Sequence, residues 1–320
     1  MTLRPISTEL AIVAKDELNE EPTQLNSQLE VVKRSFNSQR TLSGQPSDQI
    51  LLSFLRGCKF SLEKTKEKLL LFYRIRTALP QVVQDRDPLN EHVLKVIRMG
   101  VGIPLPETVS QSDPRIFVIR VAKFDLAECN FADVIKVGTM INDIMMRDDD
   151  QVVICGMSLI IDLAHVTAGH LFQFDLDFLK QVAVLYQDAS PFRMRGIHIF
   201  NPPPGMETVV KVFNGLLSSK NQDRRIFVHG SGLDSLHAHF PRHVLPVEYG
   251  GTLESIQKYV DFWENKLKKE RNYLIELTKL QDNQIGEADS LQANKSCFSV
   301  LPKNNECFGI EGSFRKLELD

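Results

Sequence analysis

The stretch VICGMSLIIDLAHV, residues 153–166, decides the fold class of this 320-residue chain. It is a short apolar run rich in β-branched residues, and such a run is typical of a β-strand. Three more runs of this kind are RIFVIRVAKF (115–124), RGIHIFN (195–201) and RRIFVHG (224–230). Helical patterns lie between these runs, and strands that alternate with helices predict an α/β fold with a mostly parallel sheet.

The helical patterns between the strands are FADVIKVGTMINDIMM (131–146), DLDFLKQVAVLYQDA (175–189) and METVVKVFNGLLSS (206–219). From Ser7 to about Arg98, apolar residues recur at threes and fours, which predicts an N-terminal helical bundle with Ser47 and Ser61 at N-cap positions. A basic helix, LESIQKYVDFWENKLKKERNYLIEL, and a polar tail end the chain. We therefore expect a helical domain over residues 1–98, an α/β domain over 99–267, and a helix end and tail over 268–320.

Composition excludes several classes of protein. Lys and Arg total 38 and Asp and Glu total 41, so the net charge does not indicate a nucleic-acid-binding protein. The five cysteines are scattered and contain no C-x-x-C pair, which indicates reduced thiols in the cytosol. No apolar run approaches the roughly 18 residues of a membrane span, and the N-terminus lacks the apolar core of a signal peptide. We expect a cytoplasmic protein.

The stretch DRRIFVHGSGLDSLHAHF, residues 223–240, has three interpretations. Gly230, Ser231 and Gly232 follow a strand and precede a helix, as in a dinucleotide-binding turn, but Ser235 replaces the third glycine and no acidic ribose partner follows. A plain strand end, glycine turn and packed helix explains the stretch better. We predict that no cofactor is bound here.

Histidines in and after this stretch give the metal-site interpretation, which rests on His229, His237, His239 and His243. His239 and His243 are one helical turn apart, but no carboxylate or cysteine with ligand spacing joins them. Pro241 also interrupts a helix between the two. The sequence alone therefore predicts no metal site.

Catalytic motifs are absent from the sequence. It contains no G-x-S-x-G elbow, and no serine or cysteine stands beside an evident base. The acidic run at residues 148–150 is typical of a solvated loop rather than a cation site. We predict no catalytic residue and no enzymatic activity.

A basic segment is the strongest chemical signal in the chain. Between Ser190 and His229, six basic residues face two acidic ones, although the chain is slightly acidic overall. Arg193 and Arg195 stand two apart in an extended segment, so their side chains point the same way. Residues 206–219 between the basic clusters are apolar on most sides, which fits either an ordinary core helix or a helix that covers an apolar cavity.

The pattern in residues 131–146 suggests how a ligand is oriented. Ile135, Thr139, Asn142 and Met146 follow one another at spacings of four, three and four. Polar Thr139 and Asn142 in an apolar stripe either orient the polar end of a greasy ligand or lie at the edge of the stripe in water.

The order and spacing of several motifs resemble the CRAL-TRIO family over roughly residues 46–267. Within that family the chain is most similar to the branch that includes alpha-tocopherol transfer protein, retinaldehyde-binding protein and the clavesins. The motifs are LLSFLRGCKFSLEKTKEKL, DPRIFVIRVAKFD, SLIIDLAHV, RMRGIHIFNPP, RRIFVHG and LPVEYGG. The resemblance implies an N-terminal helical bundle, an α/β lipid-binding domain with a mostly parallel sheet, and a mobile lid helix.

The resemblance also implies site residues. A phosphatidylinositol bisphosphate headgroup would be bound by Arg193, Arg195, Lys220 and Arg225, although one extra residue before Arg225 leaves Arg224 as a substitute. The lid would span residues 206–218, with Met206, Val209, Val212 and Phe213 as its apolar face. The pocket wall would include Ile135, Thr139, Asn142, Met157, Ile161, Phe174, Val182, Leu185, Phe192 and Ile197.

We therefore predict a cytoplasmic carrier that binds one hydrophobic ligand, such as a tocopherol, retinoid, carotenoid or similar lipid. It would transfer this ligand at phosphoinositide-containing membranes through transient peripheral contact, without binding nucleic acid. Two other hypotheses are a phosphoinositide-responsive adaptor without lipid cargo and a nucleotide-dependent oxidoreductase that acts on a retinoid. The sequence does not identify the ligand.

Overall fold

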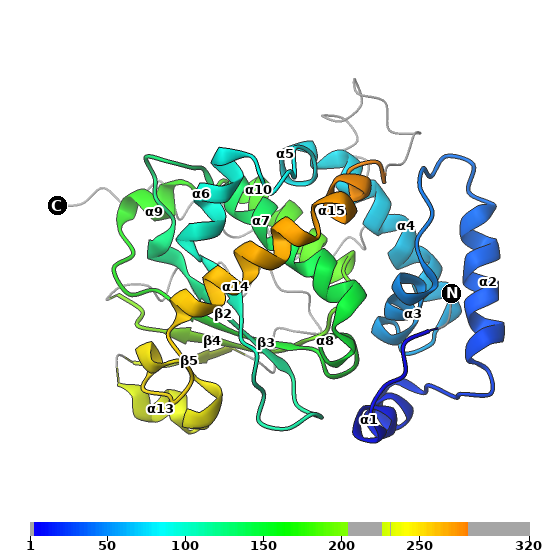
Figure 1. Ribbon diagram of the computed structural model, residues 1–320, viewed down its shortest axis with the longest axis horizontal. Coiled ribbons are helices and arrows are strands. Elements are labelled where there is room, and N and C mark those ends of the chain that lie inside the picture. The colour runs from blue at the N-terminus through cyan, green and yellow to red at the C-terminus, as the bar shows by residue number, and fades with distance from the viewer. Residues whose placement is uncertain (1–2, 204–225, 231, 281–320) are drawn as a thin grey trace, which may run out of the picture.

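A twisted sheet lies at the centre of the molecule (Figure 1). The computed structural model describes residues 3–203, 226–230 and 232–280. Within them the sheet has five strands in the order β1-β2-β3-β4-β5: β1 (Gly102–Pro104), β2 (Arg115–Arg120), β3 (Met157–Asp162), β4 (Met194–Phe200) and β5 (Ile226–Val228). β2 to β5 pair in parallel and β1 pairs antiparallel with β2. The α/β fold with a mostly parallel sheet is confirmed; β1 is an edge strand that the sequence pattern did not indicate.

One face of the sheet is covered by a layer of helices, and a small helical segment lies on the other side (Figure 1). The layer includes α6 (Glu91–Met99), α7 (Phe131–Asp148), α8 (Asp150–Cys155), α9 (Ala168–Phe172), α10 (Leu176–Ala183), α14 (Ile256–Lys269) and α15 (Arg271–Leu277). α10 continues into a π-helical turn, η2 (Val184–Asp188), and short 3₁₀ turns are η1 (Val121–Lys123), η3 (Arg242–Val244) and η4 (Val247–Tyr249). The small segment on the opposite side begins with α13 (Leu233–His237).

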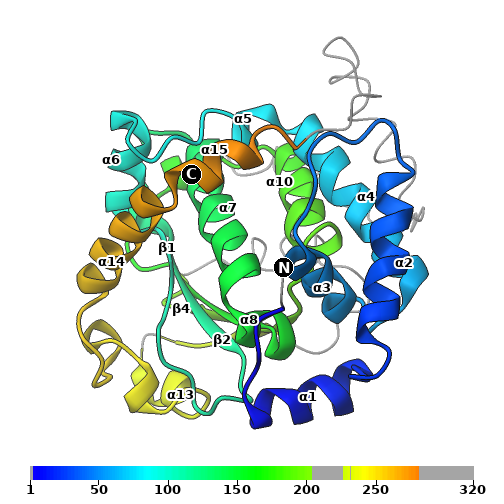
Figure 2. The same cartoon turned by 45° about the vertical axis from the view of Figure 1, so that its right-hand side comes forward.

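The N-terminal helices form one end of the molecule, seen in blue and cyan in Figures 1 and 2. They are α1 (Thr8–Leu18), α2 (Leu25–Asn37), α3 (Asp48–Gly57), α4 (Leu62–Ala78) and α5 (Pro80–Val83). Ser47 caps α3 by accepting a hydrogen bond from the Ile50 backbone N–H, whereas Ser61 precedes α4 without a side-chain cap. α1, α3 and α5 contact α7 and α8, so this end packs directly on the α/β part.

Buried ion pairs join the two parts. Arg76 of α4 donates two hydrogen bonds to Asp143 of α7, at 3.0 and 2.8 Å, and Arg86 donates a third at 2.6 Å. Burial alone would raise the pKa of Asp143, but Arg76 and Arg86 outweigh it and hold the pKa below its usual range. Asp143 therefore stays charged inside the core and fixes α4 against α7.

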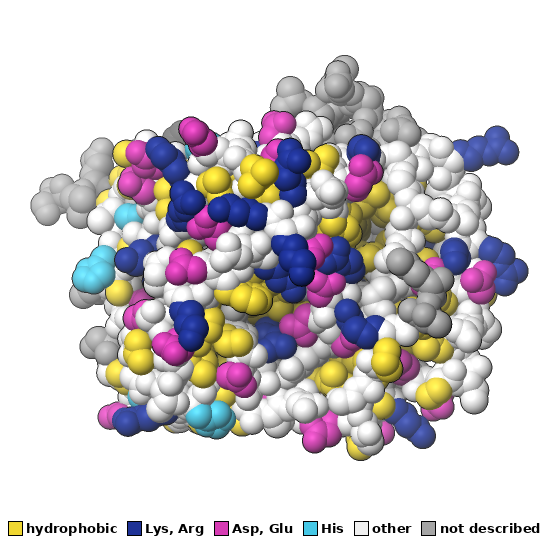
Figure 3. Space-filling model, viewed as in Figure 1, with side chains coloured by type: hydrophobic (Ala, Val, Ile, Leu, Met, Phe, Trp, Pro, Cys, Tyr) yellow, Lys and Arg dark blue, Asp and Glu magenta, His cyan; other side chains and the backbone are white. Residues whose placement is uncertain are grey.

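Several predictions concern residues outside those that the structure describes. These are the lid at residues 206–218 with Met206, Val209, Val212 and Phe213, the basic residues Lys220, Arg224 and Arg225, and the tail after residue 280. Across the described residues, none of the helices combines the length and the apolar character that crossing a bilayer requires. On the face shown in Figure 3, basic and acidic side chains are intermixed.

Candidate functional site

An apolar cavity of about 350 Å³ lies between the sheet and the helix layer. Its floor is formed by side chains of all five strands, and its walls come from α6, α7, α10 and α14. Nearly all of the lining side chains are aliphatic or aromatic. A cavity of this size and composition suits a hydrophobic small molecule.

Strand alternation explains which residues reach the cavity. Successive side chains point to opposite faces of a strand, so Met157, Leu159 and Ile161 of β3 line the cavity while the residues between them do not. In β4, Ile197 and Ile199 line it, and His198 between them points to the other face of the sheet. Each central strand thus serves two different surfaces.

The cavity has few polar side chains. Asn142 of α7 and Tyr186 and Gln187 of η2 are among its lining residues. The Tyr186 hydroxyl donates to the Ile135 carbonyl oxygen at 3.5 Å and reaches α7 over Gly138, where an added Cβ would lie 2.8 Å from this oxygen. The Asn142 carboxamide has no hydrogen-bond partner within the described part of the chain. Asn142 is therefore available to a polar group of a bound molecule.

The structure brings seven of the predicted pocket residues to the cavity wall: Ile135, Asn142, Met157, Ile161, Phe174, Val182 and Ile197. Their role in binding stays a prediction. The other three predicted residues are not among the described residues that line the cavity: Thr139, Leu185 and Phe192. Leu185 and Phe192 are buried in the main hydrophobic core instead.

Thr139 is turned away from the cavity by the packing of α7. Its hydroxyl donates to the Lys136 carbonyl oxygen at 2.8 Å and accepts from Arg86 at 3.4 Å. The side chain is 3% exposed and faces the segment that contains α5. The prediction that the polar end of the ligand meets Thr139 or Asn142 therefore reduces to Asn142.

Sequence reasoning did not assign residues of α6, β1 or α14 to the cavity wall, although β1 and most of α14 lie within the α/β domain expected over residues 99–267. Val96 and Ile97 of α6, Ile103 of β1 and Trp263 of α14 all line the cavity. The strong amphipathic pattern of α6 was visible, but it does not tell which surface the apolar face meets. Tyr186 was also not predicted to line the cavity, because it lies in a π-helical turn, and such a turn changes which side chains face inward.

The predicted basic pair lies together at the end of the sheet. Both Arg193 and Arg195 form ion pairs with Glu17 of α1, and Arg195 Nε donates to the Cys155 carbonyl oxygen at 2.7 Å. Burial and the charge of Arg195 lower the pKa of Arg193 to about 10, so it is still protonated at neutral pH. Partial burial opposes ionisation of Glu17, but the two arginines hold the pKa of its carboxyl below the usual range. The other half of the predicted clamp, Lys220 and Arg225, lies outside the described residues.

Comparison with known families adds an independent observation. A family model described as the CRAL/TRIO domain matches residues 108–251. This match confirms the resemblance to the CRAL-TRIO family that the sequence motifs indicated. A second model, described as a Pinta-like UBA domain, matches residues 21–93.

Curated relatives align with a longer part of the chain than residues 108–251. An alpha-tocopherol transfer protein-like protein of Mus musculus is 28% identical and aligns over 77% of this chain and 71% of its own length. Clavesin-2 of Homo sapiens is 25% identical over 78% of this chain and 75% of its own. A crystal structure of Sfh5 covers 85% of this chain and 99% of its own, with a TM-score of 0.48 and 11% identity. The domain match and the curated relatives support a lipid-binding protein.

The residues that match the CRAL/TRIO model do not include all of the residues that line the cavity. It includes β2 to β5, α7 and α10, but it ends before α14 and begins after α6 and β1. Since those three elements supply part of the wall, the cavity is closed by residues on both sides of the CRAL/TRIO domain.

Proposed function

We propose that this protein is a cytoplasmic carrier that binds one hydrophobic lipid in its cavity and transfers it at phosphoinositide-containing membranes, without catalysis. The ligand belongs to the class of tocopherols, retinoids, carotenoids or similar lipids. The relatives named for tocopherol transfer support this class.

The observation that carries the proposal is the cavity itself, about 350 Å³ of space between the sheet and the helices with an almost wholly apolar lining. Removing a hydrocarbon chain from a bilayer into water costs about 0.8 kcal/mol per CH₂ group. An apolar cavity replaces the lost environment, and so a carrier can move such a molecule between membranes.

The orientation of the ligand would be set by a polar side chain in the lining. Asn142 offers both a donor and an acceptor in a wall that is mostly apolar. A lipid with a single hydroxyl or carbonyl group satisfies this side chain while its hydrocarbon part fills the remaining space.

Two features would support contact with a membrane, at opposite ends of the parallel strands: Arg193 and Arg195 at the start of β4, and an exposed aromatic side chain after the end of β3. Phe172 of α9 is 83% exposed, and its neighbours Leu171 and Phe174 line the cavity. An exposed aromatic ring beside the cavity wall is suited to the interfacial region of a bilayer. The arginines would supply attraction to phosphate groups.

The test is extraction of the purified full chain with organic solvent, followed by mass spectrometry. We expect about one lipid molecule per chain. A matched pair of variants locates it: Ile161→Trp fills the cavity, whereas Val247→Trp adds the same side chain at a position that is 56% exposed. Lipid should be lost only from the Ile161→Trp variant.

The opposite results are equally informative. Protein from its own tissue without stoichiometric lipid would favour the adaptor hypothesis. Equal lipid content in both tryptophan variants would place the lipid outside the cavity and contradict the proposal.

A further inference from the structure

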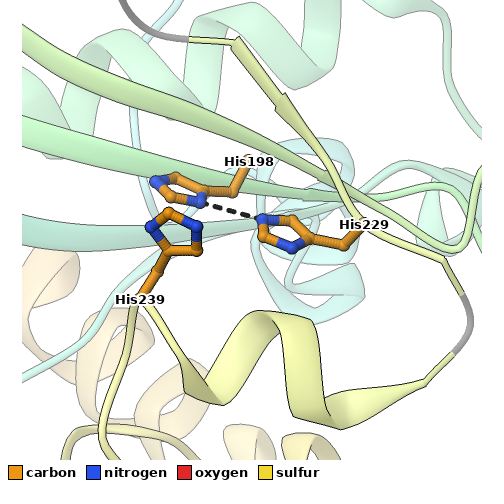
Figure 4. A group of neighbouring side chains, drawn as sticks. All are labelled: His198, His229 and His239. Carbon is orange, nitrogen blue, oxygen red and sulfur yellow. Dashed lines mark hydrogen bonds between the residues drawn. The ribbon is translucent and has the colours of Figure 1, made fainter.

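Three histidines from separate parts of the chain converge on the face of the sheet that is turned away from the cavity. His198 lies in β4, His229 directly follows β5, and His239 follows α13 (Figure 4). One ring nitrogen of each lies within 4.8 Å of the others. The strand alternation that sends Ile197 and Ile199 to the cavity places His198 on this opposite side.

The geometry of the three rings is close to what a metal site requires. His198 Nδ1 and His229 Nε2 are 3.0 Å apart, and their rings are nearly parallel at 9°. The ring of His239 stands at 66° to the first and 75° to the second, with centroids 5.0 and 5.4 Å away. Zinc–nitrogen bonds of about 2.0–2.1 Å in a tetrahedral site put ligand nitrogens about 3.4 Å apart. The His198–His229 pair therefore needs to open only slightly, and His239 needs to move inward.

A second polar contact fixes the orientation of His229. Its Nδ1 lies 3.2 Å from the Ser235 hydroxyl, which leaves Nε2 facing the other two rings. Metal-ligating histidines commonly hold their second nitrogen in this way. Ser235 is thus in the position of a residue that orients a ligand without touching the ion.

Two of the three rings are shielded from water. His198 and His229 are only 4% and 3% exposed. Phe227 stacks on His198 at 4.6 Å and Phe240 packs edge-on at 4.5 Å, which shields the buried side of the cluster.

His239 provides the path for entry. This residue is exposed, and its ring nitrogens have no hydrogen-bond partner among residues 3–203, 226–230 and 232–280. His237 is different, because its Nε2 contacts the Tyr249 carbonyl oxygen at 2.8 Å. An ion can therefore reach the two buried histidines from solvent, and His239 can then serve as its third ligand.

We propose that His198, His229 and His239 bind one divalent transition-metal ion, with Zn²⁺ as the expected ion and water in the fourth position. Imidazole ligands suit zinc, and also copper and nickel, and the cluster has no carboxylate that would favour calcium or magnesium among the described residues. The ion would tie β4, β5 and the segment after α13 together. This site is independent of the lipid-carrier proposal, because it lies on the other face of the sheet.

The experiment uses the full chain without a polyhistidine tag, freed of metal by a chelator and titrated with Zn²⁺ by calorimetry. We expect one Zn²⁺ per chain. His239→Ala should weaken binding by more than about 100-fold, and Ser235→Ala by about 10-fold, as for a residue that only orients a ligand. His243→Ala is the matched control, since it removes an exposed histidine of the same segment outside the cluster, and it should leave the affinity unchanged.

A second measurement uses the unmodified chain, so it tests the proposal even if one of the variants fails to fold. Diethyl pyrocarbonate labelling read by mass spectrometry should be suppressed by Zn²⁺ at His239 and not at His243. Absence of saturable binding of Zn²⁺, Cu²⁺ and Ni²⁺, equal loss in His239→Ala and His243→Ala, or equal protection of the two histidines would overturn the proposal.

Discussion

Asn142 and Glu17 are the two polar residues that bear most directly on the proposed function. Asn142 brings a carboxamide into an apolar wall, where a polar group without a partner is costly. Glu17 neutralises the arginine pair that would meet a membrane phosphate.

Asn142→Leu tests the polar end of the ligand. The variant should weaken binding of a hydroxyl- or carbonyl-bearing lipid by about 1–3 kcal/mol, because the buried polar group of the ligand loses its partner. Affinity is measured by fluorescence titration with the lipid and with a hydrocarbon analogue of the same shape. The analogue should bind no more weakly to the variant, and an equal loss for both ligands would mean that the substitution only distorts the cavity.

Glu17→Gln tests the arginine pair. Because Glu17 stays ionised at neutral pH and competes for Arg193 and Arg195, its neutralisation should strengthen binding to vesicles containing phosphatidylinositol bisphosphate. Arg193→Glu should have the opposite effect. Vesicle co-sedimentation against phosphatidylserine vesicles of equal charge gives the comparison, and identical changes on both vesicles would reveal general electrostatic attraction in place of headgroup recognition.

Helix α7 is the element that connects the cavity to the rest of the molecule. Asn142 on one side of it faces the cavity, and Asp143, the next residue, accepts hydrogen bonds from Arg76 and Arg86 on another. One turn of this helix thus sets both the position of a ligand contact and the attachment of the N-terminal helices.

Asp143→Asn should lower the free energy of unfolding by about 3–5 kcal/mol at pH 7, since it leaves two buried arginines without their counter-charge. The pKa of Asp143 is lower in the folded state, so its stabilising effect is complete above the unfolded carboxyl pKa of about 4. It is lost as the pH falls through the lower folded value. Urea denaturation at several pH values measures this.

Asp87→Asn is the control for the buried ion pairs, because Asp87 pairs with Arg271 at the surface. Exposed pairs contribute about 0–1 kcal/mol, and this variant should stay within that range. If the two variants lost the same stability, the buried position of Asp143 would not be the cause.

The strands and the general course of the helices could be predicted from sequence, because burial imposes a period on apolar residues. Ile135, Met157, Ile161 and Ile197 reach the cavity as this period and the family resemblance together suggested. The rotation of a helix about its axis is set by its neighbours, so Thr139 turned toward Arg86 and α5. No spacing rule would reveal that.

The histidine cluster shows a second limit. His198 and His229 are 31 positions apart and meet because β4 and β5 pair in a particular register. His239 and His243 have the spacing of one helical turn, but Pro241 argued against a helix through both, and α13 ends at His237. Contacts that depend on strand order and register cannot be found from the spacing of residues along the chain.

At the scale of the whole molecule, one hydrophobic core runs from the N-terminal helices through α7 to α14 and α15. The cavity interrupts this core between the helix layer and the sheet. A protein built around such a space gains packing contacts when a ligand fills it.

Lipid loading should therefore stabilise the chain as a whole. At a free ligand concentration of 100 times Kd, linkage adds about 2.7 kcal/mol to the free energy of unfolding. Thermal and chemical denaturation of loaded and lipid-free protein measure the shift. Ile161→Trp, with its cavity already filled, should show little response to lipid, and a response equal to that of the unmodified chain would argue that the stabilising lipid binds elsewhere.

The ion pairs of Asp143 set a lower limit to the length of any fragment of this protein that can fold by itself. A piece excised at the boundaries of the CRAL/TRIO match would keep Asp143 but lose Arg76 and Arg86, along with α6, β1 and α14 from the cavity wall. Its core would contain a carboxylate without a counter-charge, and its cavity would lie open to water. The stretch that matches the CRAL/TRIO model, residues 108–251, is therefore shorter than the stretch that must be made for the cavity to exist.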